Sequence, residues 1–365
     1  MNPPARQVAA DDGVIAKLAT LDRLVTIDFP RRGVIDMIAS LTRARFGRPV
    51  AGLAAETLIE RTRPGQLVLI ATGWLDRPHV STRVAESDGP PGAAVLARAL
   101  HDALGLVPLL LVESELVDPM EQLLHTAGLR CLSPDEALLA TESTSALHAA
   151  SVIALPKEWN AADELARRLL AQYSVGAFVA IEKGGMNRVG RIHTSRGADT
   201  TDTTAKADAV LLECTRRSIP SVGIGDGGNE IGMGSIGIEL RPLLRFGEDC
   251  GCPCGGGVTP ENETDVLVPA TVSNWGGYAI VAALAILLRR PDLLHTAEAE
   301  TSMLETSRRT GLIDGASGYV TASADGLDIN IHRRIVTLLA ATAGAGVNAG
   351  IWADEGGRPP RAIDR

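Results

Sequence analysis

Short apolar runs that alternate with helix-like segments constrain the fold of this chain more than any other feature. The first run, residues 67–72, stops at Gly73, and a helical Ala/Leu pattern at 93–104 follows it. The alternation continues along the chain, with further strand-like runs at 107–112, 151–155, 177–182, 219–224 and 266–272. Such runs between helices are typical of buried parallel strands in βαβ units. The sequence therefore predicts an α/β fold with a mostly parallel sheet flanked by helices, compact and with up to two lobes.

Helical spacing and turn residues indicate where the remaining elements and the chain ends lie. Helices are expected at 34–45, 93–104, 120–127, 163–172, 205–217, 277–288, 293–310 and 331–341. Residues 1–12 show no apolar pattern, and residues 353–365 contain Gly-Gly-Arg-Pro-Pro, which cannot continue a helix or a central strand. We expect a flexible N-terminus at 1–12, one catalytic domain at 13–352 and a flexible tail at 353–365.

Composition and charge exclude several classes of protein. The 365 residues carry 44 acidic and 35 basic side chains, and the basic ones form no long patch. Proteins that bind nucleic acid backbones need such a patch, so no nucleic-acid partner is expected. The most apolar segment, 277–288, is too short to span a bilayer, and residues 1–12 do not resemble a signal peptide. We expect no membrane association, a cytoplasmic location and a small-molecule substrate. The low aromatic content and the apolar helix are also compatible with a homo-oligomer.

The loop at 223–234, Gly-Ile-Gly-Asp-Gly-Gly-Asn-Glu-Ile-Gly-Met-Gly, is the densest chemical motif. It contains G-x-G-x-x-G after an expected strand, which by itself is a weak dinucleotide signal. Asp226 and Glu230 would repel a phosphate, so they favour a divalent cation or an amine as the ligand. A tight turn with solvated acids is the structural alternative. The candidate site residues from this loop are Asp226, Gly227, Gly228, Asn229 and Glu230.

Further carboxylates follow other expected strands, at the edge where open α/β sheets bind ligands. Glu86 and Asp88 precede a Pro-Pro-Gly turn, where Asp88 could also simply cap the turn. Glu182 ends an apolar run, so it needs a partner, for which Lys183, Arg188 or a metal are the options. Carboxylate oxygens suit Mg²⁺ or Mn²⁺. The candidate metal ligands are Glu86, Glu182, Asp226 and Glu230, and the candidate catalytic residues are Asp88, Glu182, Asp226, Asn229 and Glu230.

The candidate substrate-binding residues lie in three other segments and in the glycine-rich loop. Arg196 could bind a substrate carboxylate through two hydrogen bonds, or form a surface ion pair. Ser273 and Asn274 offer a hydroxyl and an amide beside Trp275, although an Asn cap with a packed Trp is the alternative. Asp314 stands in an Asp-Gly turn dipeptide. Gly227 and Gly228 complete the set.

Three of the five cysteines stand together in Cys250-Gly-Cys-Pro-Cys254. Zinc sites usually combine a close cysteine pair with a second pair elsewhere, but Cys131 and Cys214 are isolated. The sequence therefore favours reduced thiols in a loop near the site over structural zinc.

Together these motifs resemble the D-glutamate cyclase family, in its C-terminal catalytic domain. The resemblance covers roughly residues 21–339 and rests on the motifs at 86–93, 181–183, 223–234, 272–276 and 311–315. It implies conversion of D-glutamate to 5-oxo-D-proline with loss of water. One archaeal relative resembles a manganese-dependent phosphatase with an acidic metal-binding cavity.

These motifs are compatible with three functions. The favoured one is a D-glutamate cyclase-like hydro-lyase assisted by Mn²⁺ or Mg²⁺, with Asp88 removing the amine proton and with Arg196 and Asn274 anchoring the α-carboxylate. A metal-dependent phosphatase that uses the same carboxylates is the second. The third is a module that binds a nucleotide or an amino acid, supported only by the embedded G-x-G-x-x-G.

Overall fold

The structure is a computed structural model that describes residues 12–344. Seven parallel strands form one sheet in the order β3-β4-β2-β1-β5-β6-β7. This confirms the α/β class and the parallel sheet. The strands are β1 (Leu67–Thr72), β2 (Val107–Val112), β3 (Arg130–Cys131), β4 (Ala149–Ala154), β5 (Val175–Ile181), β6 (Ser221–Gly225) and β7 (Val266–Pro269). The expected flexible ends lie outside the described residues, except that Asp12 is the first residue of a helix.

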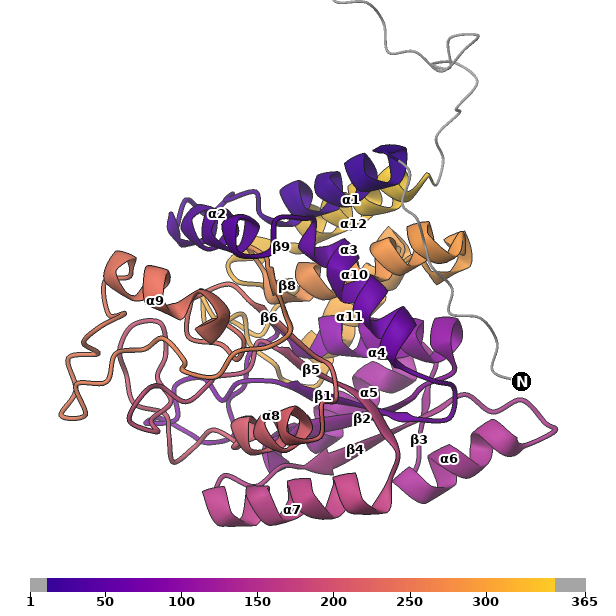
Figure 1. Cartoon of the computed structure of the whole chain (residues 1–365), viewed down its shortest axis with the longest axis horizontal. Helices are drawn as coiled ribbons and strands as arrows, with labels where there is room; N and C mark the ends of the chain where they lie inside the picture. The colour runs from indigo at the N-terminus through magenta and orange to yellow at the C-terminus, as the bar shows by residue number, and fades with distance from the viewer. Residues whose placement is uncertain (1–11, 345–365) are drawn as a thin grey trace, which may run out of the picture.

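Helices cover both faces of the sheet (Figure 1). One face packs against α3 (Val50–Arg61), α4 (Pro90–Leu104), α5 (Val117–Ala127) and α10 (Ser273–Leu288), with α1 (Asp12–Val25), α11 (Ala297–Arg309) and α12 (Ile329–Ala343) beyond them. The other face packs against α6 (Pro134–Glu142), α7 (Trp159–Gln172) and α8 (Ala207–Arg216). Central strands are buried on both faces, which is why they are continuously apolar in sequence.

Smaller elements complete the layer above the carboxyl ends. Helix α2 (Val34–Phe46) contacts β7 and the short helix α9 (Gly237–Leu240). A two-stranded antiparallel hairpin, β8 (Ser323–Ala324) and β9 (Leu327–Asp328), precedes α12. None of the described helices is long and apolar enough to cross a membrane.

Several element boundaries differ from the sequence-based prediction, and α1, α3 and α6 were not predicted. Helix α10 begins at Ser273, so Ser273 and Asn274 occupy its first turn instead of a loop. Gly276 lies inside this helix. The position requires glycine because a Cβ there would come 2.4 Å from Ile224 Cγ2 of β6. Helix α11 begins at Ala297 and not at Leu293, since the Thr296 side chain accepts a hydrogen bond from Ala299 N and caps the helix. Strand β7 ends at Pro269, three residues earlier than expected.

The order of the strands places a crevice between β1 and β5. From β1 the chain proceeds to β2 on one side, and it later returns to pair β5 on the other side of β1. Loops that follow such neighbouring strands diverge, and ligands of open α/β sheets bind in the opening. The fold therefore brings the loops after β1, β5 and β6 together at one edge.

Candidate active site

A cavity of about 580 Å³ opens at this edge of the sheet. Its volume lies in the range of small-molecule sites, and charged groups dominate its wall. The charged lining residues are Arg32, Asp76, Arg77, Glu86, Glu182, Arg196, Asp226 and Asp325. Trp74 and Asn229 also line it. Carboxylates and guanidinium groups thus face one space.

Glu182 follows β5 directly and has a left-handed backbone, with φ of 46°. A non-glycine residue pays a conformational cost for this backbone, which is more common at functional sites. Its Oε2 accepts a 2.5 Å hydrogen bond from Ser273 Oγ. The partners considered from sequence lie elsewhere, because Lys183 pairs with Glu113 and Arg188 donates to backbone carbonyls. Gly89 packs against Glu182, and a Cβ at Gly89 would come 2.8 Å from the Glu182 Cβ.

Asp88 caps helix α10 from a distant part of the chain. Its carboxylate accepts hydrogen bonds from the backbone N–H groups of Ser273 (2.8 Å), Asn274 (2.9 Å) and Gly89 (3.0 Å). Asn274 contacts the Asp88 segment in turn, because its Oδ1 accepts hydrogen bonds from Gly89 N and Gly92 N. Its Nδ2 donates to a backbone carbonyl as well. The structure thus uses the Asn274 amide to join α10 to the loop after β1.

Glu230 holds the glycine-rich loop together from within. Its two carboxylate oxygens accept hydrogen bonds from four consecutive backbone N–H groups, those of residues 226–229, at 2.7 to 3.1 Å. Gly227 and Gly228 thereby give their amides to Glu230. A phosphate cradle requires free backbone amides, and here a carboxylate already occupies them. Asn229 donates from Nδ2 to the carbonyl oxygen of His193.

Asp226 points into the cavity and meets two residues that sequence reasoning missed. Arg32 Nη1 lies 2.9 Å from Asp226 Oδ2 and 3.0 Å from Asp325 Oδ2. Arg32 precedes α2, and Asp325 forms the turn between β8 and β9. In sequence Asp325-Gly326 reads as an ordinary turn, and no local signal joins it to a residue 293 positions away. Asp314, a predicted substrate-binding residue, instead accepts from Ser317 N and Gly326 N within this segment.

The crowded carboxyl groups have raised pKa values. Burial raises the pKa of Asp88 to about 8, with Asp325 adding to the shift and the backbone N–H groups opposing it. Burial also raises the pKa of Glu182, Asp226 and Glu86 well above the usual range, and neighbouring carboxylates raise each of them further. Such groups are stabilised by protons or by a bound cation. Perturbed acids in a cleft are typical of functional sites.

Three carboxylates offer oxygens close enough for one metal ion. Ligand atoms of Asp88, Glu182 and Asp226 all lie within 4.8 Å of one another. Two of them, Glu182 and Asp226, were predicted ligands, and Asp88 takes the place expected for Glu230. Glu86 lines the same cavity outside this group. A second group combines His193 with the three clustered cysteines.

Arg196 lines the cavity and is exposed, and its positive charge contrasts with the buried acids. Thr194 and Ser195 precede it in the wall. Arg196 forms no hydrogen bond or ion pair with another part of the described chain, so its guanidinium is free to bind a ligand. Arg77, by contrast, pairs with Asp76.

Comparison with known proteins assigns the chain to a family. The model of the family described as "D-glutamate cyclase-like, C-terminal" matches residues 21–340. The chain belongs to this family. It is also 27% identical over 297 residues to the human protein named "D-glutamate cyclase, mitochondrial", across 74% of this chain and 45% of that relative. This cyclase-like chain therefore spans less than half the length of that relative. The relative's name places it in mitochondria, so the location of this chain stays a prediction.

A buried ion pair lies among the loops at the carboxyl edge of the sheet. Lys183 Nζ donates to Glu113 Oε1 (2.5 Å) and to the carbonyl of Gly73 (2.9 Å), and the side chains of both charged residues are fully buried. Glu113 also accepts from Ala205 N. These contacts tie together the segments that follow β1, β2 and β5.

We expect Lys183→Met to lower the free energy of unfolding by about 3–5 kcal/mol, because Glu113 would be left as an unpaired buried charge. Urea denaturation of the purified variant measures this loss. The matched control is Lys157→Met, which breaks the partly exposed pair with Glu115 and should cost less than about 1 kcal/mol. Equal losses of unfolding free energy in the two variants would show that the buried pair stabilises the protein no more than the partly exposed pair does.

We expect the metal-free cyclase-like domain to lose stability as pH rises from 5 to 8. Asp88, Glu182 and Asp226 have raised pKa values when folded, so the folded chain binds more protons than the unfolded chain between the two pKa values. The free energy of unfolding then falls with rising pH, by up to about 1.4 kcal/mol per pH unit for each carboxyl. Urea titrations in a chelator measure this slope. Added Mn²⁺ should flatten it, and a metal-free stability that rises across this window would contradict the prediction.

Proposed function

We propose that the chain cyclises D-glutamate, or a closely related amino acid, to 5-oxo-D-proline with loss of water, as a hydro-lyase. The family supports the reaction class. The observation that carries the proposal is the meeting of Asp88, Glu182 and Asp226 at the crevice between β1 and β5, in a cavity whose wall includes Arg196. A glutamate carries one ammonium and two carboxylates, and this cavity offers groups of both complementary signs.

In the proposed orientation, the ammonium faces Glu86, the γ-carboxyl faces the other three acids, which would hold a cation, and the α-carboxylate faces Arg196. The reacting amine and γ-carboxyl are already tethered, so the cavity has to fold the substrate and transfer protons. The amine nitrogen forms a bond to the γ-carbon and a C–O bond breaks. The two protons that the ammonium loses end on the departing oxygen, which leaves as water.

Glu86 is the proposed proton carrier. Its carboxyl lines the cavity and forms no hydrogen bond with another part of the described chain, and burial raises its pKa, so the group holds a proton more readily than an exposed glutamate does. Asp88, the base inferred from the sequence, uses three acceptor positions on backbone N–H groups. We therefore propose Asp88 as a positioning residue and metal ligand.

The chemistry of the donor set fits Mn²⁺ or Mg²⁺, which prefer carboxylate oxygens. Asp88, Glu182 and Asp226 would hold the ion. A divalent cation bound there supplies polarisation of the γ-carboxyl group. Ser273 fixes the orientation of Glu182 by donating its hydroxyl hydrogen to Oε2. Arg32 does the same for Asp226.

A substrate panel tests the proposal. Purified protein is incubated with D-glutamate, L-glutamate or a phosphate ester, with Mn²⁺, Mg²⁺ or a chelator, and products are followed by NMR. We expect 5-oxoproline from D-glutamate in the presence of metal. Phosphate release without 5-oxoproline would favour the phosphatase. Tight metal-free binding of NAD or ATP without any turnover would favour a binding module.

A further inference from the structure

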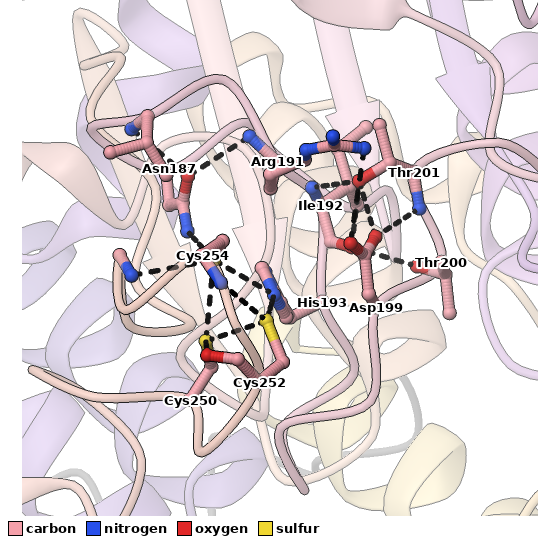
Figure 2. A network of polar contacts seen from close by, with 12 residues as sticks. Asn187, Arg191, Ile192, His193, Asp199, Thr200, Thr201, Cys250, Cys252 and Cys254 are labelled. Carbon is pink, nitrogen blue, oxygen red and sulfur yellow. Dashed lines mark hydrogen bonds and ion pairs between the residues drawn. The ribbon is translucent and has the colours of Figure 1, made fainter.

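We propose that His193, Cys250, Cys252 and Cys254 form a structural zinc site, separate from the carboxylate cavity. Figure 2 shows the His193 imidazole directed at the cysteine loop. Its Nε2 lies 3.3 Å from Cys252 Sγ and 3.5 Å from Cys254 Sγ. Cys250 Sγ lies 3.1 Å from Cys252 Sγ and 3.3 Å from Cys254 Sγ.

The four donor atoms have the identity and spacing of a Cys₃His zinc site. All of them lie within 4.8 Å of one another. Zinc–ligand bonds of about 2.3 Å to sulfur and 2.0–2.1 Å to nitrogen give tetrahedral edges of about 3.8 Å between sulfurs and 3.6 Å between sulfur and nitrogen. The observed separations are somewhat shorter than these edges, and small shifts of the side chains would bring the four donors to tetrahedral positions. The sulfur separations are also far longer than a disulfide bond, and the cysteines are free.

Several hydrogen-bond donors surround the sulfurs of Cys252 and Cys254. Backbone N–H groups of Cys254 and Gly256 donate to Cys252 Sγ (3.4 Å) and Cys254 Sγ (3.3 Å). Asn187 Nδ2 donates to Cys254 Sγ at 3.8 Å. The guanidinium of Arg188 adds positive charge beside the loop through bonds to the carbonyls of Glu248 and Gly255. Hydrogen-bond donors that contact a metal-bound sulfur in this way hold the thiolate in place.

Soft thiolate donors with one imidazole select zinc over the oxygen-seeking ions proposed for the carboxylate cavity. Three residues separate Cys250 from Cys254, which is within the usual spacing of a zinc-binding pair. His193 comes from a segment 57 residues before Cys250 in the chain, so the site would join two loops that are distant in sequence. Structural sites of this type are closed by four protein ligands.

The zinc site would fix one wall of the cavity. The His193 carbonyl accepts from Asn229 of the glycine-rich loop. Gly197 packs so closely against Cys250 that a Cβ would come 2.3 Å from the Cys250 carbonyl oxygen. The segment between His193 and Gly197 carries Arg196. On one side of Arg196, His193 is itself a proposed zinc ligand. On the other side, Gly197 packs against Cys250, which is another proposed ligand.

Metal content of the intact protein tests the proposal. The full chain is purified without a metal-affinity step, and zinc, iron, copper and manganese are measured by mass spectrometry. We expect about one zinc per chain, and Cys252→Ser should lose at least about four fifths of it because a ligand thiolate is gone. Cys131→Ser, which removes an isolated thiol, and Glu182→Gln, which alters the carboxylate cavity, should both keep their zinc.

Cobalt substitution of the native protein tests the geometry without any variant, in case Cys252→Ser does not fold. Co²⁺ bound by three thiolates and one imidazole should show intense visible bands typical of tetrahedral coordination, and added Zn²⁺ should abolish them. The proposal would be overturned if the protein contained no zinc, or contained iron or copper in place of zinc. Full zinc retention by Cys252→Ser, or a disulfide between two of the three cysteines, would overturn it as well.

Discussion

Glu182→Gln is expected to lower kcat for 5-oxoproline formation by about a thousandfold, a loss typical of removing a group that binds a catalytic ion or carries a proton. The same substitution should stabilise the metal-free protein at pH 8, because it removes a buried carboxylate among like charges. The amide retains the size of the side chain and can still accept the Ser273 hydrogen bond. Steady-state kinetics and urea denaturation measure the two effects.

The opposite signs of these effects separate a functional carboxylate from a structural one. A residue that only supported the fold would lose stability and activity together when changed. Glu239→Gln, an exposed residue of α9, is the matched control and should leave both quantities unchanged. Wild-type kcat in Glu182→Gln would remove Glu182 from the mechanism.

Asp226→Asn is expected to weaken Mn²⁺ binding by about a hundredfold, since one of three charged oxygen ligands becomes a neutral amide. The variant also leaves Arg32 with Asp325 as its remaining ion-pair partner, so part of the Arg32 charge faces the ion without compensation. Titration of Mn²⁺ followed by electron paramagnetic resonance measures the affinity directly, independently of turnover.

Asp36→Asn provides the comparison for this titration, because Asp36 is exposed on α2 and touches none of the three proposed ligands. Its Mn²⁺ affinity should equal that of the wild type. Unchanged affinity in Asp226→Asn would place the ion elsewhere, and the cyclase proposal would then need another source of carboxyl polarisation.

The strands could be predicted from sequence because their environment is uniform. β1 and β2 are buried along their whole length, so each reads as an unbroken apolar run. The first turn of α10 could not be predicted, since its capping group is Asp88, which lies 185 residues earlier. Helix α3 was missed for a related reason, because Pro49 at its N-cap offers no side-chain cap. Local pattern thus predicts elements whose stabilising contacts are local or averaged over a face.

The same division holds for the site. Glu182, Asp226 and Arg196 were predicted and share the cavity, because each follows a strand or lies in a loop at the carboxyl edge. Arg32 and Asp325 were not predicted, and Glu230 has a different environment from the one expected. Their contacts depend on how distant loops pack. The His193 contact with the cysteine loop was invisible in sequence for the same reason.

The central claim is that the cavity between the ends of β1 and β5 is where the amino-acid substrate reacts. A crystal structure of the protein with Mn²⁺ and 5-oxo-D-proline tests it most directly, with the ion located by anomalous scattering. We predict an anomalous peak bound by Glu182 and Asp226, with the product beside it and its carboxylate facing Arg196. Product bound at another surface, with no ion among these carboxylates, would contradict the account.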